Sequence, residues 1–280
     1  MKFRTVNYTI SAKRLPPEFG GFKIVHLSDL HGALYGRDNE ELVREIRRIS
    51  PHIIFMTGDM ADSSPYGVPR LKNLCSQLCG DYPVYGVLGN HEQELEQDVR
   101  NPLLKSLKKM GVTILENEWR TISRQGASIR LYGLVTPMKY YKDILKEYQW
   151  GVKFTAEDTS KLLGEGEVSC YKILLAHNPL YYPAYRDWGA DLTLSGHIHG
   201  GIIRIPKLGG LLSPDLTLFP RYDGGHFKEQ GKDLVVSRGL GNHFLVRVLN
   251  PPELVTIVLQ SPKRERDSGT RHRPTLQSPT

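Results

Sequence analysis

Residues 24–31 of the chain read Ile-Val-His-Leu-Ser-Asp-Leu-His, an apolar run that stops at polar side chains. Residues 53–59, Ile-Ile-Phe-Met-Thr-Gly-Asp, follow the same pattern. Apolar runs of this length bounded by polar and glycine residues predict buried strands. The segment between them, residues 37–50, places four apolar side chains on one helical face: Leu42, Val43, Ile46 and Ile49. We therefore expect a βαβ unit with a right-handed crossover.

Three further apolar runs end in the same way, at residues 84–88, 172–175 and 191–194. The segments that follow them are Gly89-Asn90-His91-Glu92, Ala176-His177-Asn178-Pro179 and Ser195-Gly196-His197-Ile198-His199-Gly200. Polar residues on the loops that follow strands gather along one edge of a sheet, where open α/β sheets bind their ligands. The sequence therefore predicts one cleft lined by metal-binding residue types.

The remaining chain alternates between helical and strand patterns. We expect helices at residues 68–78 and 93–110, the second interrupted or restarted by Pro102. Alternation at period two predicts strands near residues 112–115, 119–122 and 128–133, with a turn before the last, and strands at 233–237 and 254–259 close the fold. Residues 140–163 are predicted to mix helix and loop and to carry exposed aromatic side chains. The economical architecture is an α/β fold with two mixed β-sheets packed as a sandwich and flanked by helices.

Composition is ordinary for a globular protein, with 39% hydrophobic and 24% charged residues among 280. The formal net charge of +7 is partly due to the last twenty residues, where five basic residues face two acidic ones. We expect residues 1–260 to form the folded domain and residues 261–280 a disordered basic tail. The alternative is that the tail is attracted weakly to anionic lipid or nucleic acid.

Two features bear on the compartment. The chain has only three cysteines, Cys75, Cys79 and Cys170, and this small, odd number argues against a disulfide framework. They suggest buried free thiols in a reducing compartment. The sequence has no uninterrupted apolar run long enough for a membrane helix, and residues 1–14 lack the apolar core of a secretory signal. These observations predict a cytoplasmic protein.

The polar residues at the strand ends form a set of oxygen and imidazole ligands without a thiolate: Asp29, His31, Asp59, Asn90, His177, His197 and His199. Mixed nitrogen and oxygen ligands suit Mn²⁺, Fe²⁺, Zn²⁺, Ni²⁺ or Co²⁺, and they argue against structural zinc or an iron–sulfur cluster. Seven ligands are too many for one tetrahedral site. They suit two divalent ions that share a bridging carboxylate, and we expect Mn²⁺ to be the preferred ion.

In order along the chain, Asp-x-His, Gly-Asp-x-x-Asp, Gly-Asn-His-Glu, His and Gly-His-x-His resemble the motifs of the calcineurin-like metallophosphoesterase superfamily. The resemblance runs from about residue 22 to 259 and implies that family's four-layer fold. Residues 202–206, 219–222, 236–241 and 252–254 look like those of the bacterial YkuE/YaeI-type branch.

The resemblance also implies a role for each matching residue. Asp29, His31 and His199 would bind one ion, and Asn90, His177 and His197 the other. Asp59 would bridge the two ions, with a hydroxide held between them as the nucleophile. His91 would protonate the leaving oxygen, and Asp62 would hold His91 in the correct tautomer. Many family members have Asp where this chain has Glu92, and we expect this difference to matter little because the residue is not a ligand in the motif.

These roles predict a dinuclear metal-dependent phosphodiesterase acting on a phosphate-ester small molecule or lipid. The first alternative is a pyrophosphate hydrolase acting on a nucleotide-linked lipid of the UDP-diacylglucosamine type, with residues 208–218 binding acyl chains. The second is a non-catalytic interaction module on the same fold, and the third a nuclease. No specific nucleic-acid partner is predicted, because the basic residues gather in the tail and no stacking motif is clear.

Several residues have an ordinary structural interpretation as well as a functional one. We expect five histidines to be ordinary core or surface residues: His26, His52, His226, His243 and His272. Four aromatic residues after Pro179 are expected to pack locally, with a stacking platform as the alternative: Tyr181, Tyr182, Tyr185 and Trp188. Residues 202–222 form a lid, a lipid-contacting patch or a packed loop. Arg204 and Arg221 are candidates for additional phosphate contacts.

Overall fold

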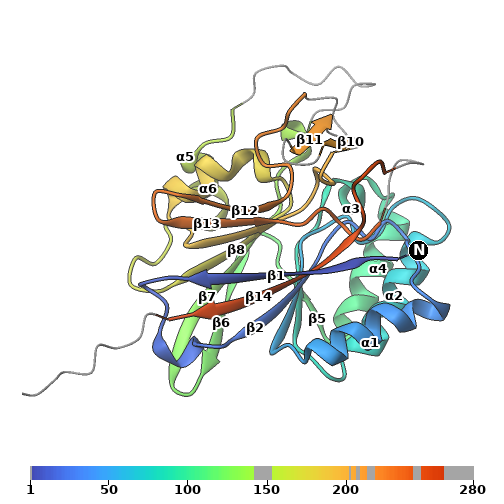
Figure 1. Ribbon diagram of the computed structural model, residues 1–280, viewed down its shortest axis with the longest axis horizontal. Helices are drawn as coiled ribbons and strands as arrows, with labels where there is room; N and C mark the ends of the chain where they lie inside the picture. Colours follow the sequence, from blue (N-terminus) through green and yellow to red (C-terminus); the bar gives the residue numbers. More distant parts are fainter. Residues whose placement is uncertain are drawn as a thin grey trace, which may run out of the picture.

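The computed structural model describes residues 2–141, 153–201, 203–205, 209–212, 218–241 and 247–261 (Figure 1). It contains two six-stranded sheets. The first has the order β1 (Arg4–Ser11), β14 (Glu253–Gln260), β2 (Lys23–Leu27), β3 (Ile53–Met56), β4 (Val84–Gly86) and β5 (Val112–Ile114). The second has the order β12 (Gly225–Glu229), β13 (Lys232–Val236), β9 (Leu192–Ser195), β8 (Lys172–Ala176), β7 (Ala127–Leu134) and β6 (Glu118–Arg124).

Both sheets are mixed, and each has a parallel centre. Strands β2, β3, β4 and β5 pair in parallel, and β14 joins β2 in antiparallel register. In the second sheet β13, β9, β8 and β7 pair in parallel, with β12 and β6 antiparallel at the two edges. Parallel centres bring the carboxyl ends of several strands to the same edge, as the motif positions required.

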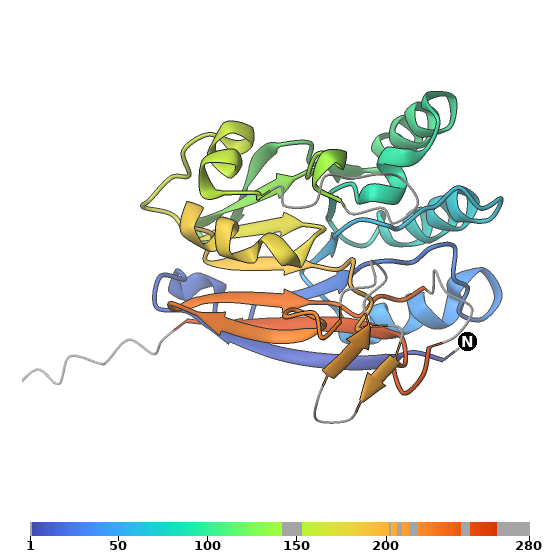
Figure 2. The ribbon, with the colours of Figure 1, turned by 90° about the horizontal axis from the view of Figure 1, so that it is seen from above.

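Helices cover the outer face of each sheet (Figures 1 and 2). The first sheet packs against α1 (Glu40–Ile49), α2 (Gly67–Leu78) and α4 (Gln97–Met110), and the second against α5 (Ala156–Leu163) and α6 (Tyr182–Trp188). The shorter elements are α3 (Asn90–Glu94), η1 (Pro17–Phe19), η2 (Arg37–Asn39), η3 (Met138–Tyr140) and η4 (Pro179–Tyr181). The predicted sandwich of two mixed sheets flanked by helices is confirmed.

Alternation along the strands divides the core into layers. In β3, Ile54 and Met56 face the helices, whereas Ile53 and Phe55 face the second sheet. In β8, Ile173 and Leu175 fill the space between the sheets, whereas Leu174 packs with α5 and α6. Because both faces of these strands are buried, their sequences read as continuous apolar runs without polar alternation.

The first predicted helix forms with the expected face, since all four of its apolar side chains are buried in α1. The expectation at Pro102 is wrong, because α4 runs through this residue and the break falls between Glu94 and Gln97. Pro102 has no backbone N–H to donate to the carbonyl of Asp98, but Asp98 is exposed and its carbonyl can bind water instead. The helix therefore continues through the proline. The structure also adds β1 and β12, whose mostly part-exposed residues gave no apolar run.

The expectation of exposed aromatic residues in 140–163 is wrong for Tyr140, Tyr141 and Phe154, which are all buried. The local packing expected after Pro179 is confirmed, because Tyr182, Tyr185 and Trp188 are buried as well. The basic tail from residue 262, His243, His272 and much of residues 202–217 lie outside the described residues. In the described part of the chain, no helix combines the length and the apolar character needed to cross a membrane.

Candidate metal centre

The predicted ligands meet where the carboxyl ends of the two sheets adjoin. Asp29, Asp59 and Asn90 follow β2, β3 and β4 of the first sheet. His177 and His197 follow β8 and β9 of the second. The ligand set is therefore divided between two sheets, and it exists only because the sheets pack face to face. The sequence predicted a single edge, whereas the structure uses two.

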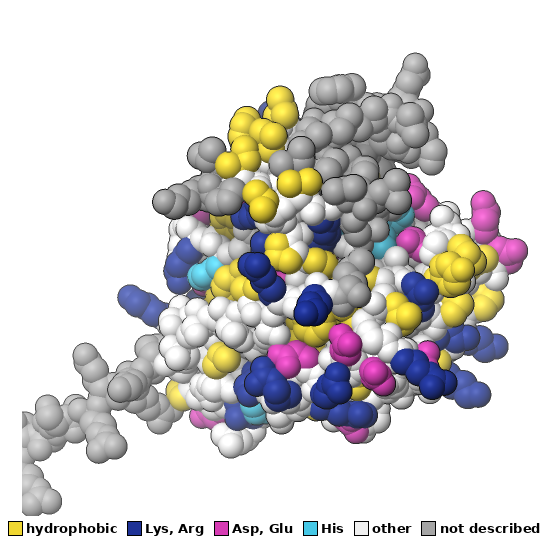
Figure 3. Space-filling view, turned by 45° about the vertical axis from the view of Figure 1, so that its right-hand side comes forward, with side chains coloured by type: hydrophobic (Ala, Val, Ile, Leu, Met, Phe, Trp, Pro, Cys, Tyr) yellow, Lys and Arg dark blue, Asp and Glu magenta, His cyan; other side chains and the backbone are white. Residues whose placement is uncertain are grey.

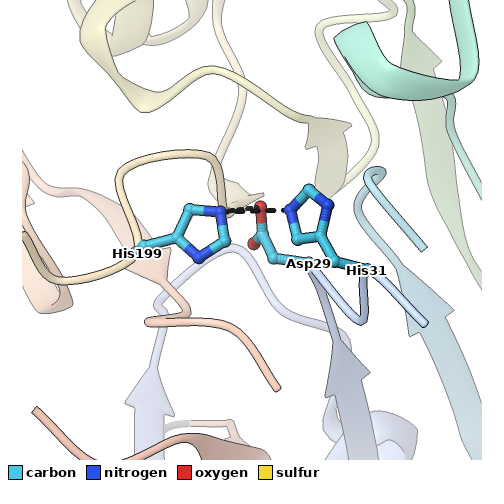
Figure 4. Close-up of side chains that lie close together, drawn as sticks. All are labelled: Asp29, His31 and His199. Atoms are coloured by element: carbon cyan, nitrogen blue, oxygen red, sulfur yellow. Dashed lines mark hydrogen bonds and ion pairs between the residues drawn. The ribbon is translucent and has the colours of Figure 1, made fainter. Parts of the chain in front are cut away.

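Asp29, His31 and His199 form the first group of potential ligand atoms (Figure 4). The Nε2 atom of His199 lies 3.4 Å from Asp29 Oδ1 and 3.2 Å from His31 Nε2. All three residues are buried. Only one of these two imidazole nitrogens can carry a hydrogen toward the other, and a metal ion bound by both lone pairs would take the place of that hydrogen.

Asp59 lies at the centre of the remaining contacts. Its Oδ2 atom is 3.0 Å from His177 Nε2 and 3.9 Å from the Nε2 atoms of both His31 and His91. Its Oδ1 atom accepts a hydrogen bond from the backbone N–H of His91 at 2.9 Å. One carboxylate thus faces histidines from both sheets, as a ligand shared by two ions must.

His177, Asp59 and His197 form the second group whose ligand atoms lie close together. The Nδ1 atom of His177 is 2.7 Å from the carbonyl oxygen of Thr57. Because a carbonyl only accepts, Nδ1 carries the hydrogen, and Nε2 is left to face Asp59 and an ion. His197 is oriented through its backbone N–H, which donates to both carboxylate oxygens of Asp29 at 3.1 and 3.2 Å.

Five of the seven predicted ligands have a left-handed backbone, with φ between 43° and 69°: Asp29, His31, Asp59, His197 and His199. This region is costly for residues with a Cβ atom and is maintained where the surrounding structure enforces it. The strain turns each of these side chains sharply off the end of its strand, so that five side chains from three loops point to one volume. Such clustering is typical of functional sites.

Two glycines permit the loops to approach this closely. Gly58 has φ of +93°, and a Cβ atom there would lie 2.5 Å from the backbone nitrogen of Gly89. A Cβ atom at Gly89 would lie 2.1 Å from Asp59 Oδ1. These glycines therefore set the distance between the loops after β3 and β4.

Glu92 matters more to the site than the sequence suggested. It is buried, and its Oε2 atom accepts hydrogen bonds from the N–H groups of Asp59 at 2.8 Å and Gly89 at 2.9 Å. Its Oε1 atom accepts from Ala61 at 2.8 Å. The carboxylate thereby ties the loop of Asp59 to the loop of Asn90. Glu92 therefore fixes two ligand loops without binding the metal itself, and the small effect expected for Glu in place of Asp at this position stays a prediction.

The two predicted catalytic residues, His91 and Asp62, both lie next to His31. The His91 and His31 rings meet edge to face with centroids 4.8 Å apart. Asp62 Oδ2 is 3.8 Å from His31 Nδ1, and its Oδ1 accepts hydrogen bonds from Ser64. Glu94 Oε2 lies 3.9 Å from His91 Nδ1. The pairing of Asp62 with His91 stays a prediction, with Glu94 as a second carboxylate that could orient His91.

The arginines proposed to contact phosphate are engaged elsewhere. Arg204 pairs with Asp223 at 2.8 Å, and Arg221 pairs with Glu229 at 2.9 Å. Arg247, which the sequence analysis missed, places its guanidinium 3.1 Å from His199 Nδ1. It lies on the loop before β14, far from any motif, so no sequence pattern marks it.

The electrostatics of the site follow from burial and close charges. Burial raises the pKa of Asp29 to about 6. Although burial works in the opposite direction, the neighbouring histidines hold the pKa of Asp59 well below its usual range. Burial would also lower the pKa of His177, but the Asp59 carboxylate outweighs it and raises that pKa to about 9. A metal ion and this proton compete for the same ring nitrogen.

The donor set fits two divalent ions. Asn90 Oδ1 is buried and, among the described residues, has no hydrogen-bond partner, which is unusual for an amide oxygen next to charged groups. A bound metal ion is one group that would give this oxygen a partner. Carboxylate, amide and imidazole ligands without thiolate are those that Mn²⁺, Fe²⁺, Zn²⁺ and related ions accept.

The other histidines in the described part of the chain behave as ordinary residues. His26 is buried with Nε2 2.8 Å from Thr57 Oγ1, and burial lowers its pKa to about 3. His52 accepts from the backbone N–H of Lys23 at 3.0 Å, and His226 lies 2.8 Å from Asp233. The three cysteines are free thiols, with Cys75 buried and the other two partly buried.

Comparison with known proteins shows the family to which the chain belongs. The pattern of the calcineurin-like phosphoesterase family matches residues 22–201, and the chain belongs to this family. It is 30% identical over 268 residues to the uncharacterized metallophosphoesterase YkuE of Bacillus subtilis, covering 92% of this chain and 85% of YkuE. The predicted resemblance to the calcineurin-like superfamily and to its YkuE/YaeI-type members is confirmed.

Two other relatives have names that state an activity. The phosphodiesterase YaeI of Escherichia coli is 25% identical over 243 residues, covering 85% of this chain and 82% of YaeI. The UDP-2,3-diacylglucosamine pyrophosphatase LpxG of Chlamydia trachomatis is 26% identical over 287 residues, covering 86% of this chain and 85% of LpxG. The family and these relatives support a hydrolase that acts on phosphate esters.

Proposed function

We propose that the chain is a dinuclear metal-dependent phosphodiesterase. The observation that carries the proposal is the position of Asp59, whose Oδ2 lies 3.0–3.9 Å from the Nε2 atoms of His177, His31 and His91. A single carboxylate placed between two groups of ligands suits two metal ions better than one. Family membership supports the same chemistry.

In this proposal Asp29, His31 and His199 hold one ion, and Asn90, His177 and His197 hold the other. Asp59 contributes to both. Two divalent ions, when bound, neutralise the phosphate and activate water for attack on phosphorus. The chain itself keeps the ligands in place through Glu92, through the Thr57 carbonyl on His177 and through the Asp29 carboxylate on the His197 backbone.

His91 is proposed as the acid. Its side chain is 19% exposed, whereas the side chains of His31 and His177 are 1% and 0% exposed, so a substrate can reach His91 more readily than these two ligands. As the new oxygen–phosphorus bond forms and the bond to the leaving group breaks, an imidazolium here can donate its proton to the departing oxygen. Asp62 and Glu94 are the carboxylates that could orient the pair of His31 and His91.

A phosphodiester is the favoured substrate class, in agreement with the name of the relative YaeI. The pyrophosphate of a nucleotide-linked lipid is the second candidate, because the relative LpxG is named for that activity. Mn²⁺ as the preferred ion, the cytoplasmic location, and residues 1–260 as a single domain stay predictions.

The test is hydrolysis of bis-p-nitrophenyl phosphate by metal-stripped protein to which Mn²⁺, Ni²⁺, Co²⁺, Zn²⁺ or Mg²⁺ is restored singly. We expect activity to return with Mn²⁺ and to fall by about 10²–10⁴-fold in His91→Ala, which keeps its metal affinity. Cleavage of a nucleotide-linked lipid pyrophosphate without diester cleavage would select the second candidate. Two bound ions with no hydrolysis of either substrate would leave the non-catalytic module.

A further inference from the structure

Exposed apolar side chains gather on the small third sheet of the protein. This sheet pairs β10 (Ile203–Ile205) with β11 (Gly209–Leu212). In the described part of the chain, eight large apolar side chains are exposed, and four of them form two adjacent pairs: Leu218, Phe219, Val248 and Leu249. Figure 3 shows hydrophobic side chains at the upper end of the molecule, where Figure 1 places β10 and β11.

Both pairs are joined to the small sheet by backbone hydrogen bonds. The N–H of Arg204 in β10 donates to the carbonyl of Val248 at 3.1 Å. The N–H of Phe219 donates to the carbonyl of Leu211 in β11 at 3.0 Å. The pairs therefore lie along the two outer edges of one element, and we name these four residues the apolar tip.

Two of these exposed residues have a backbone conformation that is unfavourable for large side chains. Phe219 has φ of 47° and Leu249 has φ of 54°, in the left-handed region that large side chains avoid. Their side chains are 61% and 69% exposed. A chain that only needed to fold would gain by placing Gly or Asn at such positions. The combination of strain and exposure points to a contact outside the chain.

Hydrogen bonds join the segments of the tip to the loop that carries His199. Asn250, next to Leu249, donates from Nδ2 to the carbonyls of His199 at 2.6 Å and Gly201 at 2.7 Å. Arg204 in β10 bonds the carbonyl of Gly200 at 3.2 Å and the carboxylate of Asp223 at 2.8 Å. Whatever the tip binds is thus held in a set orientation to His199.

We propose that the apolar tip inserts into an anionic membrane surface and seats the metal centre against it. Arg221 lies two residues after Phe219, and its side chain is 70% exposed. Arg221 pairs with Glu229, which also binds Arg186 and the Tyr222 hydroxyl, so Glu229 keeps two partners if the Arg221 guanidinium turns from it to a lipid phosphate. The chain carries a formal charge of +7, of which residues 261–280 contribute +3, so residues 1–260 carry +4, a sign that favours anionic lipids.

The size of the tip also favours a membrane over a protein. Among the described residues the tip has four side chains, which are 42–69% exposed and by themselves offer less than the roughly 800 Å² per partner that a stable protein interface buries. A bilayer makes no such demand, because apolar side chains insert singly below the headgroups while basic residues remain at the phosphate level.

The test is co-sedimentation of the full chain with phosphatidylcholine vesicles, with and without phosphatidylglycerol. The double variant Phe219→Asn with Leu249→Asn removes both apolar side chains, and Asn is well tolerated at left-handed positions, so the fold is retained. The matched control is Val168→Asn, because Val168 is 83% exposed and lies outside the tip. We expect the double variant to bind anionic vesicles at least about tenfold more weakly, and the control to bind like wild type.

Equal binding of wild type and double variant would overturn the proposal, as would binding that does not depend on phosphatidylglycerol. A dimer in sedimentation velocity that the double variant abolishes would assign the tip to self-association instead. The inference does not depend on the proposed reaction. Hydrolysis of the soluble diester is expected to be unchanged in the double variant, so failure of one proposal leaves the other intact.

Discussion

A methyl group added at Gly89 tests the placement of Asp59 directly. Gly89 has φ of −88° and ψ of −171°, an extended backbone that Ala adopts freely, so Gly89→Ala introduces no conformational strain. The new Cβ atom would lie 2.1 Å from Asp59 Oδ1, 2.6 Å from its backbone nitrogen and 2.8 Å from its carboxyl carbon. Real Cβ atoms essentially never lie within 3.0 Å of a neighbour, so the loop or the carboxylate must move by about 1 Å.

That displacement has two measurable consequences. The hydrogen bond from the His91 N–H to Asp59 Oδ1, now 2.9 Å, is broken or lengthened. A shift of about 1 Å in a reacting group costs on the order of 10²-fold in rate. Overpacking of a buried contact costs about 1–3 kcal/mol of folding free energy. We therefore expect Mn²⁺-restored diester hydrolysis to fall about 100-fold, with a moderate loss of stability in urea.

The control is Gly80→Ala, because a Cβ atom at Gly80 meets nothing within 4 Å. Both variants carry the same chemical change, and only one of them touches the centre. If Gly89→Ala matches Gly80→Ala in hydrolysis and in urea midpoint, Asp59 does not need its present position, and the proposed bridging role is wrong.

Three other predictions concern the surroundings of the centre. Glu92→Ala leaves the N–H groups of Asp59, Ala61 and Gly89 without their acceptor, so it should lower the free energy of unfolding by about 3 kcal/mol in a urea titration. The control, Glu94→Gln at an exposed position, should leave the free energy of unfolding unchanged. Equal urea midpoints for the two variants would contradict the prediction. Asn90→Ala should weaken one of two Mn²⁺ binding events in calorimetry by about tenfold or more, and two wild-type affinities would refute the assignment. His26→Gln should flatten the pH dependence of stability. The pKa of His26 is about 3 in the folded protein against 6.5 in the unfolded chain, so wild type loses up to about 1.4 kcal/mol per pH unit as pH falls through this range; an unchanged slope would reject burial as the cause.

The sequence predicted the elements whose evidence is local. The face of α1, the strands that precede each motif and the hairpin of β6 and β7 follow from periodicity and turn residues, and all are present. Strands β1 and β12 escaped notice, because edge strands with part-exposed residues lack an apolar run. The prediction of a break at Pro102 was wrong because it ignored exposure. A missing N–H donor costs little where the carbonyl that it would bond faces solvent, and α4 runs through the proline.

The identities of the candidate ligands were also written in the sequence, because ligand chemistry is a property of residue type. The sequence also predicted that they meet in one cleft, but it placed them at a single sheet edge. Their actual arrangement depends on two sheets that meet face to face and on a left-handed backbone at five of the seven positions. Glu92 and Arg247 show the limit most clearly. Each acts through contacts with residues more than 30 positions away along the chain, and no local pattern encodes a hydrogen bond between distant loops. Residue type determined what the site can bind, and the packing of the two sheets decided where each side chain lies.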